Sequence, residues 1–239
     1  MASLESTHAE ASTARRRHPA VLGLLFVALV AVLNVALNGV LGGLQSALPS
    51  PLQFEYVVTA PLTPLGASAL FVAAGVLTVC ALGAFVRSVG GTGSAELEPT
   101  SFAETVRRFA RATVVAFVGT LAAAFGLLLF VLPGLVVLVY LPFVFVAVVL
   151  DGRSVGGAVE VSHTRVSARP GLVAATALAT VSGLLGLGLG GVFTSALPPV
   201  TEFAVGGTGS ALVALAGAYL LTALYRRLPV QSSPTTGRL

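Results

Sequence analysis

The sequence predicts an all-α polytopic membrane protein with six transmembrane helices. Of its 239 residues, 56% are apolar and only 9% are charged, whereas about 25% of the residues of a soluble domain are charged. Residues 112–150 contain no charge, and as a helix they would extend ~58 Å, about twice the ~30 Å hydrocarbon core of a bilayer. Arginines recur between the apolar segments at alternate connections. So few charges would not cover a water-exposed surface.

The predicted spans follow from the apolar segments taken in order. Residues 1–18 are polar and end in three arginines and a histidine, and we expect them to be a disordered cytoplasmic tail. The apolar segment that follows is longer than the hydrophobic region of a signal peptide, so we expect it to remain as the first span. A six-helix domain then occupies residues 19–228, and residues 229–239 form a second disordered cytoplasmic tail. The spans are expected at about 21–44, 66–86, 112–132, 135–150, 171–193 and 204–225.

The third and fourth spans are expected to form a hairpin with its turn at Leu132-Pro133-Gly134. A re-entrant hairpin would leave the same charge pattern but would need a shorter apolar segment. Within the fourth span, Pro142 removes a backbone hydrogen bond and predicts a kink.

The arginines predict the orientation of the spans. All thirteen basic residues are arginine, and they lie before the first span, after the second, fourth and sixth spans, or before the third and fifth. The connections at 46–65, around Pro133 and at 194–203 carry none. By the positive-inside rule, both termini are cytoplasmic and the protein is expected in the cell membrane.

Two short interfacial helices are expected on the cytoplasmic side. In the first, residues 101–111, Ser101 and Glu104 form a capping box, and Phe102, Val106 and Phe109 share a face opposite three arginines. In the second, residues 154–168, the residues expected to share one face are Val155, Val159, Ser162 and Val166.

A polar face is predicted on the first span. At 100° per residue, Asn34, Asn38 and Gln45 fall within about 40° of one another. Amides in hydrocarbon need hydrogen-bonding partners. This face therefore either forms hydrogen bonds between helices or lines a polar cavity.

Small residues at four-residue spacing predict close helix packing, either within the chain or in an oligomer. They are Gly39 and Gly43 on the first span, Ser182, Gly186 and Gly190 on the fifth, and Gly206, Ser210, Ala214 and Ala218 on the sixth.

The predicted spans contain no Asp, Glu, Lys, Arg or His, the residues on which proton relays and ion pathways usually depend. The single cysteine, Cys80, lies in an apolar segment, and the three histidines lack metal-ligand spacing. We therefore expect no catalytic residues, cofactor or metal. Nucleic-acid binding is not expected either, because the arginines lie at helix ends, where lipid headgroups and topology explain them.

The segment from Leu132-Pro133-Gly134 through the apolar residues 135–150 to Asp151-Gly152, followed by Ala158 and Ser162 on a helix, resembles the membrane domain attached to some glycerophosphodiester phosphodiesterases and its stand-alone multi-pass relatives. The use of arginine alone is similar to members from halophilic archaea. The usual Arg-Arg between Ala and Ser is replaced here by Val159-Glu160-Val161. In the fused proteins, hydrolysis belongs to a separate soluble barrel that this sequence does not contain, so the resemblance does not imply phosphodiesterase activity.

Three functions are compatible with these features. The first is a non-enzymatic structural, regulatory or accessory component of the membrane, whose partners are the lipid bilayer and other membrane proteins or copies of itself. The alternative is a small-solute permease that uses the Asn34 face. A third is an enzyme on lipid substrates that uses Glu55 or Glu202, the acids expected in the outer loops.

Overall fold

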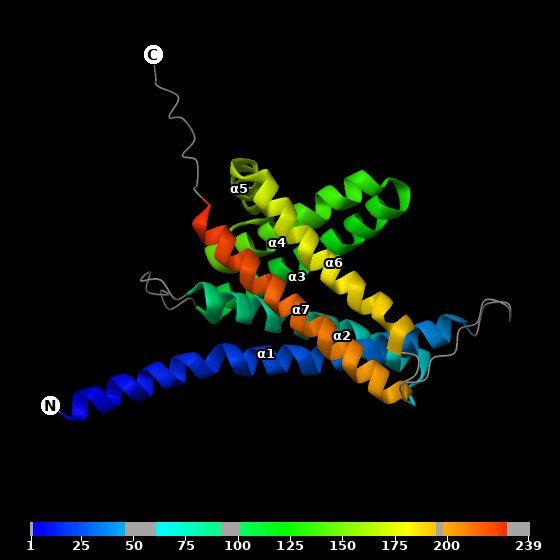
Figure 1. The fold of residues 1–239 in the computed structure, drawn as a ribbon, viewed down its shortest axis with the longest axis horizontal. Helices are drawn as coiled ribbons and strands as arrows, with labels where there is room; N and C mark the ends of the chain where they lie inside the picture. Colours follow the sequence, from blue (N-terminus) through cyan, green and yellow to red (C-terminus); the bar gives the residue numbers. More distant parts are fainter. Residues whose placement is uncertain (1, 46–60, 92–100, 195–197, 229–239) are drawn as a thin grey trace, which may run out of the picture. The chain divides into compact units, whose positions relative to one another are not determined.

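The structure is a computed structural model that describes residues 2–45, 61–91, 101–194 and 198–228. The described part of the chain has an all-α fold with seven α-helices (Figure 1). These are α1 (Ala2–Gln45), α2 (Pro64–Gly90), α3 (Phe102–Leu129), α4 (Val131–Asp151), α5 (Val155–Ala168), α6 (Pro170–Thr194) and α7 (Pro199–Arg227).

Five of these helices are long and apolar enough to cross a membrane. The segments concerned are Pro19–Gln45, Pro64–Gly90, Phe102–Leu129, Leu132–Asp151 and Val200–Arg227. In α6, the apolar helix Pro170–Gly183 is shorter and is not one of the five. The chain therefore has the helices of a polytopic membrane protein.

The helix boundaries follow from local sequence signals. Helices α2, α6 and α7 begin at Pro64, Pro170 and Pro199, where the missing N–H of proline would have no partner within the helix. Helices α3 and α5 are capped by serines. The Ser101 Oγ accepts a hydrogen bond from the Glu104 N–H (3.2 Å), and the Ser154 Oγ accepts one from the Gly157 N–H (3.3 Å).

The predicted turn between the third and fourth spans differs in position. The helix breaks at Phe130, which is extended (φ −149°, ψ 113°), and α4 begins at Val131. The prediction placed the break at Leu132-Pro133-Gly134 because proline interrupts helices. Pro133 instead lies in the first turn of α4, where a backbone N–H would have no intrahelical acceptor, so the N–H that proline lacks is not missed.

Two further boundaries differ from the prediction. Residues 101–111 do not form a separate helix, because α3 continues without interruption from Phe102 to Leu129. Residues 2–18, predicted to be disordered, are helical and continuous with the rest of α1. They are rich in Ala, Glu and Arg, which favour helix, and they extend an existing helix without a separate nucleation step.

The chain divides into two compact units. The first comprises residues 1–88 and 182–215, and its core consists of Phe26, Ala81, Ala211 and Leu215. The second comprises residues 89–181 and 216–239. In the second unit α4 packs against both α3 and α5.

The C-terminal half of α4 is the most deeply buried part of the chain that the structure describes. Every side chain from Phe143 to Val149 is buried, and the helix continues through Pro142. A helix that is apolar on all faces is typical of a position surrounded by protein.

Candidate functional site

Three side chains gather around the carboxylate of Asp151, the last residue of α4. The Tyr225 hydroxyl donates a hydrogen bond to Asp151 Oδ2 (2.7 Å). The same oxygen lies 3.5 Å from Arg153 Nε and 4.0 Å from Arg165 Nη2. The cluster therefore joins α4, α5 and the C-terminal part of α7, all within the second unit.

Arg165 is largely buried in this cluster, with 11% of its side chain exposed. Its Nη1 donates to the backbone carbonyl of Tyr225 (2.7 Å), and its guanidinium carbon lies 3.7 Å from the centre of the Tyr225 ring. The last carbonyls of a helix lack intrahelical donors and favour a nearby cation. Arg165 therefore anchors the C-terminal end of α7 to α5.

The hydroxyl of Tyr225 can be tested separately from its ring. Tyr225→Phe removes the hydrogen bond to Asp151 but keeps the ring against Arg165 and against Phe143, whose ring centre is 6.3 Å away. We expect the free energy of unfolding to fall by about 1–2 kcal/mol, measured by thermal unfolding in detergent. Tyr219→Phe is the matched control, because Tyr219 lies on the same helix with an exposed side chain. Equal destabilisation by the two variants would contradict the assignment.

A second arginine anchors the end of α4. Arg108 on α3 donates from Nη1 to the Val149 carbonyl (3.4 Å), and its Nη2 lies 3.4 Å from the Glu104 carboxylate. Gly152, which ends α4 in the left-handed conformation (φ 65°), lies against this guanidinium. A Cβ added to Gly152 would lie 2.7 Å from Arg108 Nη2 and would displace the guanidinium, while the left-handed backbone itself favours glycine.

A polar cavity of about 310 Å³ opens beside Arg108. Its lining residues come from the start of α3 and from the end of α4, namely Ser101, Ala103, Glu104, Arg107, Arg108, Arg111 and Gly152. Three arginines face one glutamate there. The Nε of Arg108 is buried and has no hydrogen-bond partner among the described residues. The cavity therefore carries net positive charge, which suits an anion.

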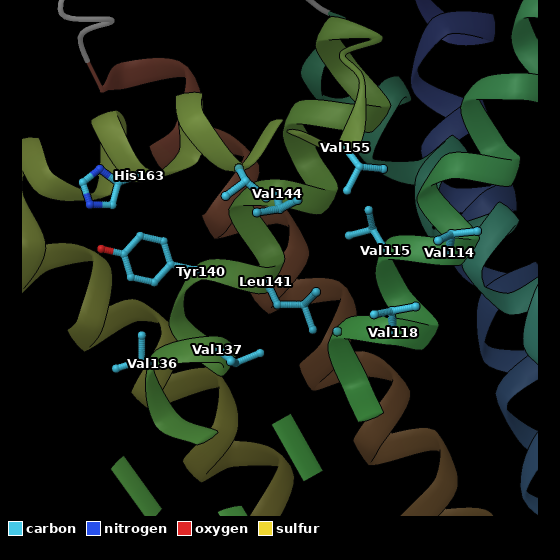
Figure 2. A pocket seen from close by; sticks show the side chains of 12 residues that line it. Val114, Val115, Val118, Val136, Val137, Tyr140, Leu141, Val144, Val155 and His163 are labelled. Carbon is cyan, nitrogen blue, oxygen red and sulfur yellow. The ribbon is translucent and has the colours of Figure 1, made fainter. Parts of the chain in front are cut away.

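An apolar groove of about 400 Å³ lies between α3, α4 and α5 (Figure 2). Most of its lining is valine, from α3 (Val114, Val115, Val118), α4 (Val136, Val137, Val144) and α5 (Val155, Val159), with Gly119, Tyr140, Leu141 and His163 completing it. Figure 2 shows His163 beside the Tyr140 ring. The two rings stack with their centres 6.0 Å apart.

On α5, the buried face overlaps the predicted shared face only in part. Ala158, Ser162 and Val166 are its buried residues. Val155 and Val159, which we expected on the same face as Ser162, are exposed and line the groove. Helical periodicity groups residues on one face but does not show how much of this face another helix covers.

The predicted polar face of α1 lies in the first unit, whereas both cavities are lined by residues of the second unit. The Asn34 Nδ2 donates to the Val30 carbonyl of its own helix (3.0 Å). A Cβ added to Gly207 of α7 would lie 3.8 Å from that nitrogen. Asn38 and Gln45 are half-buried on the same helix. Whether this face lines a cavity stays a prediction.

The small residues of α1 lie where α2 begins. An added Cβ at Gly39 would be 2.9 Å from the Ala67 Cβ, and one at Gly43 would be 3.1 Å from the Pro64 Cβ. On α7, Ala214 packs against the core of the first unit, and Ser210 is half-buried. On α6, Ser182 is exposed, while Gly186 and Gly190 lie in the part where only the helical backbone is described. Their role in an oligomer stays a prediction.

The two outer-loop acids are not brought together among the described residues. Glu202, predicted in a loop, lies in the first turn of α7, because that helix begins at Pro199 and an acid at a helix N-terminus is favourable. Glu55 lies outside the described residues. No group of three His, Cys, Asp or Glu side chains that could hold a metal ion is found in the described part of the chain.

The sequence reasoning missed the polar cluster because it used the arginines only as indicators of topology. Asp151 was noted only as part of a motif. The available signal was an acid and an arginine directly after an apolar span, Asp151-Gly152-Arg153. The partners of Asp151 on α5 and α7, Arg165 and Tyr225, are 14 and 74 residues away from it. No pattern in the sequence connects Asp151 with either of them.

Comparisons with protein-family models, with curated proteins and with solved structures find no match to this chain.

Proposed function

We propose that this chain is a non-enzymatic, six-span integral protein of the cell membrane that binds other membrane components. Both termini are cytoplasmic, α6 also crosses the membrane as the fifth of the six spans, and α5 and the start of α3 lie at the cytoplasmic headgroup region. We also propose that the chain is related to the membrane domain attached to some glycerophosphodiester phosphodiesterases.

One observation carries the proposed orientation. Arg108, Arg153 and Arg165 gather where α3 begins and where α4 and α7 end. The other end of the α3–α4 hairpin instead exposes four large apolar side chains, Leu128, Leu129, Phe130 and Leu132. Helix α4 is ~31 Å long, which matches the hydrocarbon thickness. The arginine end is therefore cytoplasmic and the Phe130 turn faces outward.

In this proposal, most polar groups at the cytoplasmic end stabilise the fold, and the rest bind a ligand. The Asp151 carboxylate accepts a hydrogen bond from the Tyr225 hydroxyl and forms ion pairs with Arg153 and Arg165. Arg108 and Arg165 donate hydrogen bonds to backbone carbonyls at the ends of α4 and α7. The cavity at Arg107 and Arg111 is the part left available for a ligand.

The proposed topology is tested by cysteine labelling in intact cells. In a Cys80→Ala background, cysteines are introduced singly as Ser12→Cys, Ser50→Cys, Ser195→Cys and Ser232→Cys. A membrane-impermeant maleimide should label positions 50 and 195 from outside and positions 12 and 232 only after permeabilisation. Labelling of positions 12 and 232 from opposite sides would overturn six spans, because an even number of crossings places both termini together.

Binding of other membrane components is tested by native mass spectrometry after isolation in mild detergent. The proposal expects a second copy, another protein or lipid to remain bound. A strict monomer that retains neither protein nor lipid would contradict it.

A further inference from the structure

The polar cavity and the apolar groove follow each other along one face of α3. The residues of α3 that line the polar cavity include positions 104, 107, 108 and 111, and those that line the groove are 114, 115, 118 and 119. These positions recur at intervals of three and four, so they share one face of the helix. From Arg111 to Val114 the rise is ~4.5 Å. The two cavities are therefore neighbours on one surface of the second unit.

The polar cavity is suited to one anionic group. Arg107, Arg108 and Arg111 bring three positive charges, and Glu104 offsets one of them. Arg108 is held in place by Val149 and Glu104 and leaves its buried Nε without a partner. No ion pair is found for Arg107 or Arg111 within the described ranges. A phosphate has several acceptor oxygens for such guanidinium groups.

The groove is suited to a hydrocarbon chain. Its lining is apolar apart from Tyr140 and His163, which stack on each other at its edge. Val136 and Val159 remain exposed within the folded chain. Water would hydrate such a surface unfavourably, whereas a lipid chain covers it at no loss.

The start of α3 fits the depth of lipid headgroups. Phe102 and Val106 are exposed apolar residues on the face away from the arginines. A helix end with apolar side chains on one face and arginines on the other is favoured at the boundary between headgroups and acyl chains. The arginine cavity then lies at phosphate depth, and the groove lies in the hydrocarbon directly below it.

We propose that this surface binds one anionic phospholipid, with its phosphate among Arg107, Arg108 and Arg111 and one of its chains in the groove. The proposal depends on α3 and α4 crossing the membrane, but not on the number of spans. Cysteine labelling tests the topology independently, so a failure of either proposal is recognised without the other.

The headgroup site is tested with the full-length protein in mild detergent. Native mass spectrometry compares retention of phosphatidylglycerol with that of phosphatidylcholine, which has the same chains and phosphate but a neutral headgroup overall. The double variant Arg107→Gln/Arg111→Gln should lower retention of phosphatidylglycerol by roughly tenfold or more, the size of one lost charge-assisted hydrogen bond. Arg108 is kept, because it also supports α4. The matched control, Arg226→Gln/Arg227→Gln, removes two exposed arginines from the end of α7 and should leave retention unchanged.

The chain site is tested by filling the groove. Val159→Phe enlarges a groove-lining side chain that is 51% exposed, and Val205→Phe does the same on α7 at an equally exposed valine outside the groove. Val159→Phe should weaken phosphatidylglycerol and leave binding of inorganic phosphate unchanged, while Val205→Phe should affect neither. Thermal unfolding of each variant checks that the fold is intact.

Four results would overturn the proposal. Equal retention of phosphatidylcholine and phosphatidylglycerol would show that charge does not select the lipid. Equal losses in the two arginine pairs would show a general effect of surface charge. Inorganic phosphate bound as tightly as phosphatidylglycerol, with no effect of Val159→Phe, would assign the cavity to free phosphate. Unfolding of Arg107→Gln/Arg111→Gln would assign these arginines to the fold.

Discussion

Replacement of Arg165 by glutamine is expected to lower the free energy of unfolding by about 3 kcal/mol. The variant loses a charge-assisted hydrogen bond to the Tyr225 carbonyl, worth about 1.5–3 kcal/mol. It also loses the contact between the guanidinium and the Tyr225 ring, worth about 1–2 kcal/mol when shielded from water. Asp151 then keeps Arg153 and the Tyr225 hydroxyl as neighbours. The end of α7 should separate from α5 before the rest of the second unit unfolds.

The measurement is thermal unfolding in detergent, where a loss of this size lowers the midpoint by roughly 5–10 °C. Arg165→Lys should be intermediate, because it keeps the charge but loses the planar group that reaches carbonyl and ring together. Arg169→Gln is the matched control, because its side chain is exposed at the end of the same helix. If Arg165→Gln and Arg169→Gln unfolded at the same midpoint temperature, Arg165 would not stabilise the contact between α5 and the end of α7.

The membrane class was predictable from the sequence because it depends on the length and polarity of single segments. Five helices confirm that part. Four of them extend beyond their predicted limits at both ends, and α3 begins earlier but ends three residues before its predicted limit. The third and fourth spans were found for the same reason. Their turn was placed three residues too late, because a sequence shows that proline disrupts helices but not which helical turn it occupies.

The polar cluster was not predictable in the same way. Tyr225 and Asp151 are 74 residues apart, and their contact depends on α4 and α7 ending together. Helical periodicity places residues on a face but does not identify the helix that covers this face. The capping of α3 by Ser101, in contrast, is local, and the predicted bond to Glu104 is present. The carboxylate half of that capping box was wrong, since Glu104 pairs with Arg108 instead.

Replacement of Gly126 by leucine is expected to destabilise the α3–α4 hairpin by about 3 kcal/mol or more. A Cβ added at Gly126 would lie 2.8 Å from both Cα and N of Gly134, and 3.3 Å from the carbonyl carbon of Pro133. A Cβ at Gly134 would in turn meet the backbone of Gly126 and Leu127. The obstacle is backbone on both sides, so no side-chain rotation relieves it. The first turn of α4 would have to move away from α3.

The matched control is Gly42→Leu, because no described atom lies within 4 Å of a Cβ built at Gly42. Both substitutions replace a helical glycine with a residue that favours helix by about 0.5–1 kcal/mol. If propensity alone mattered, both variants would become more stable. We expect opposite signs instead, with Gly126→Leu unfolding at a lower temperature than the parent and Gly42→Leu at an equal or higher one. An increase for both would show that α3 and α4 are not in backbone contact at Gly126.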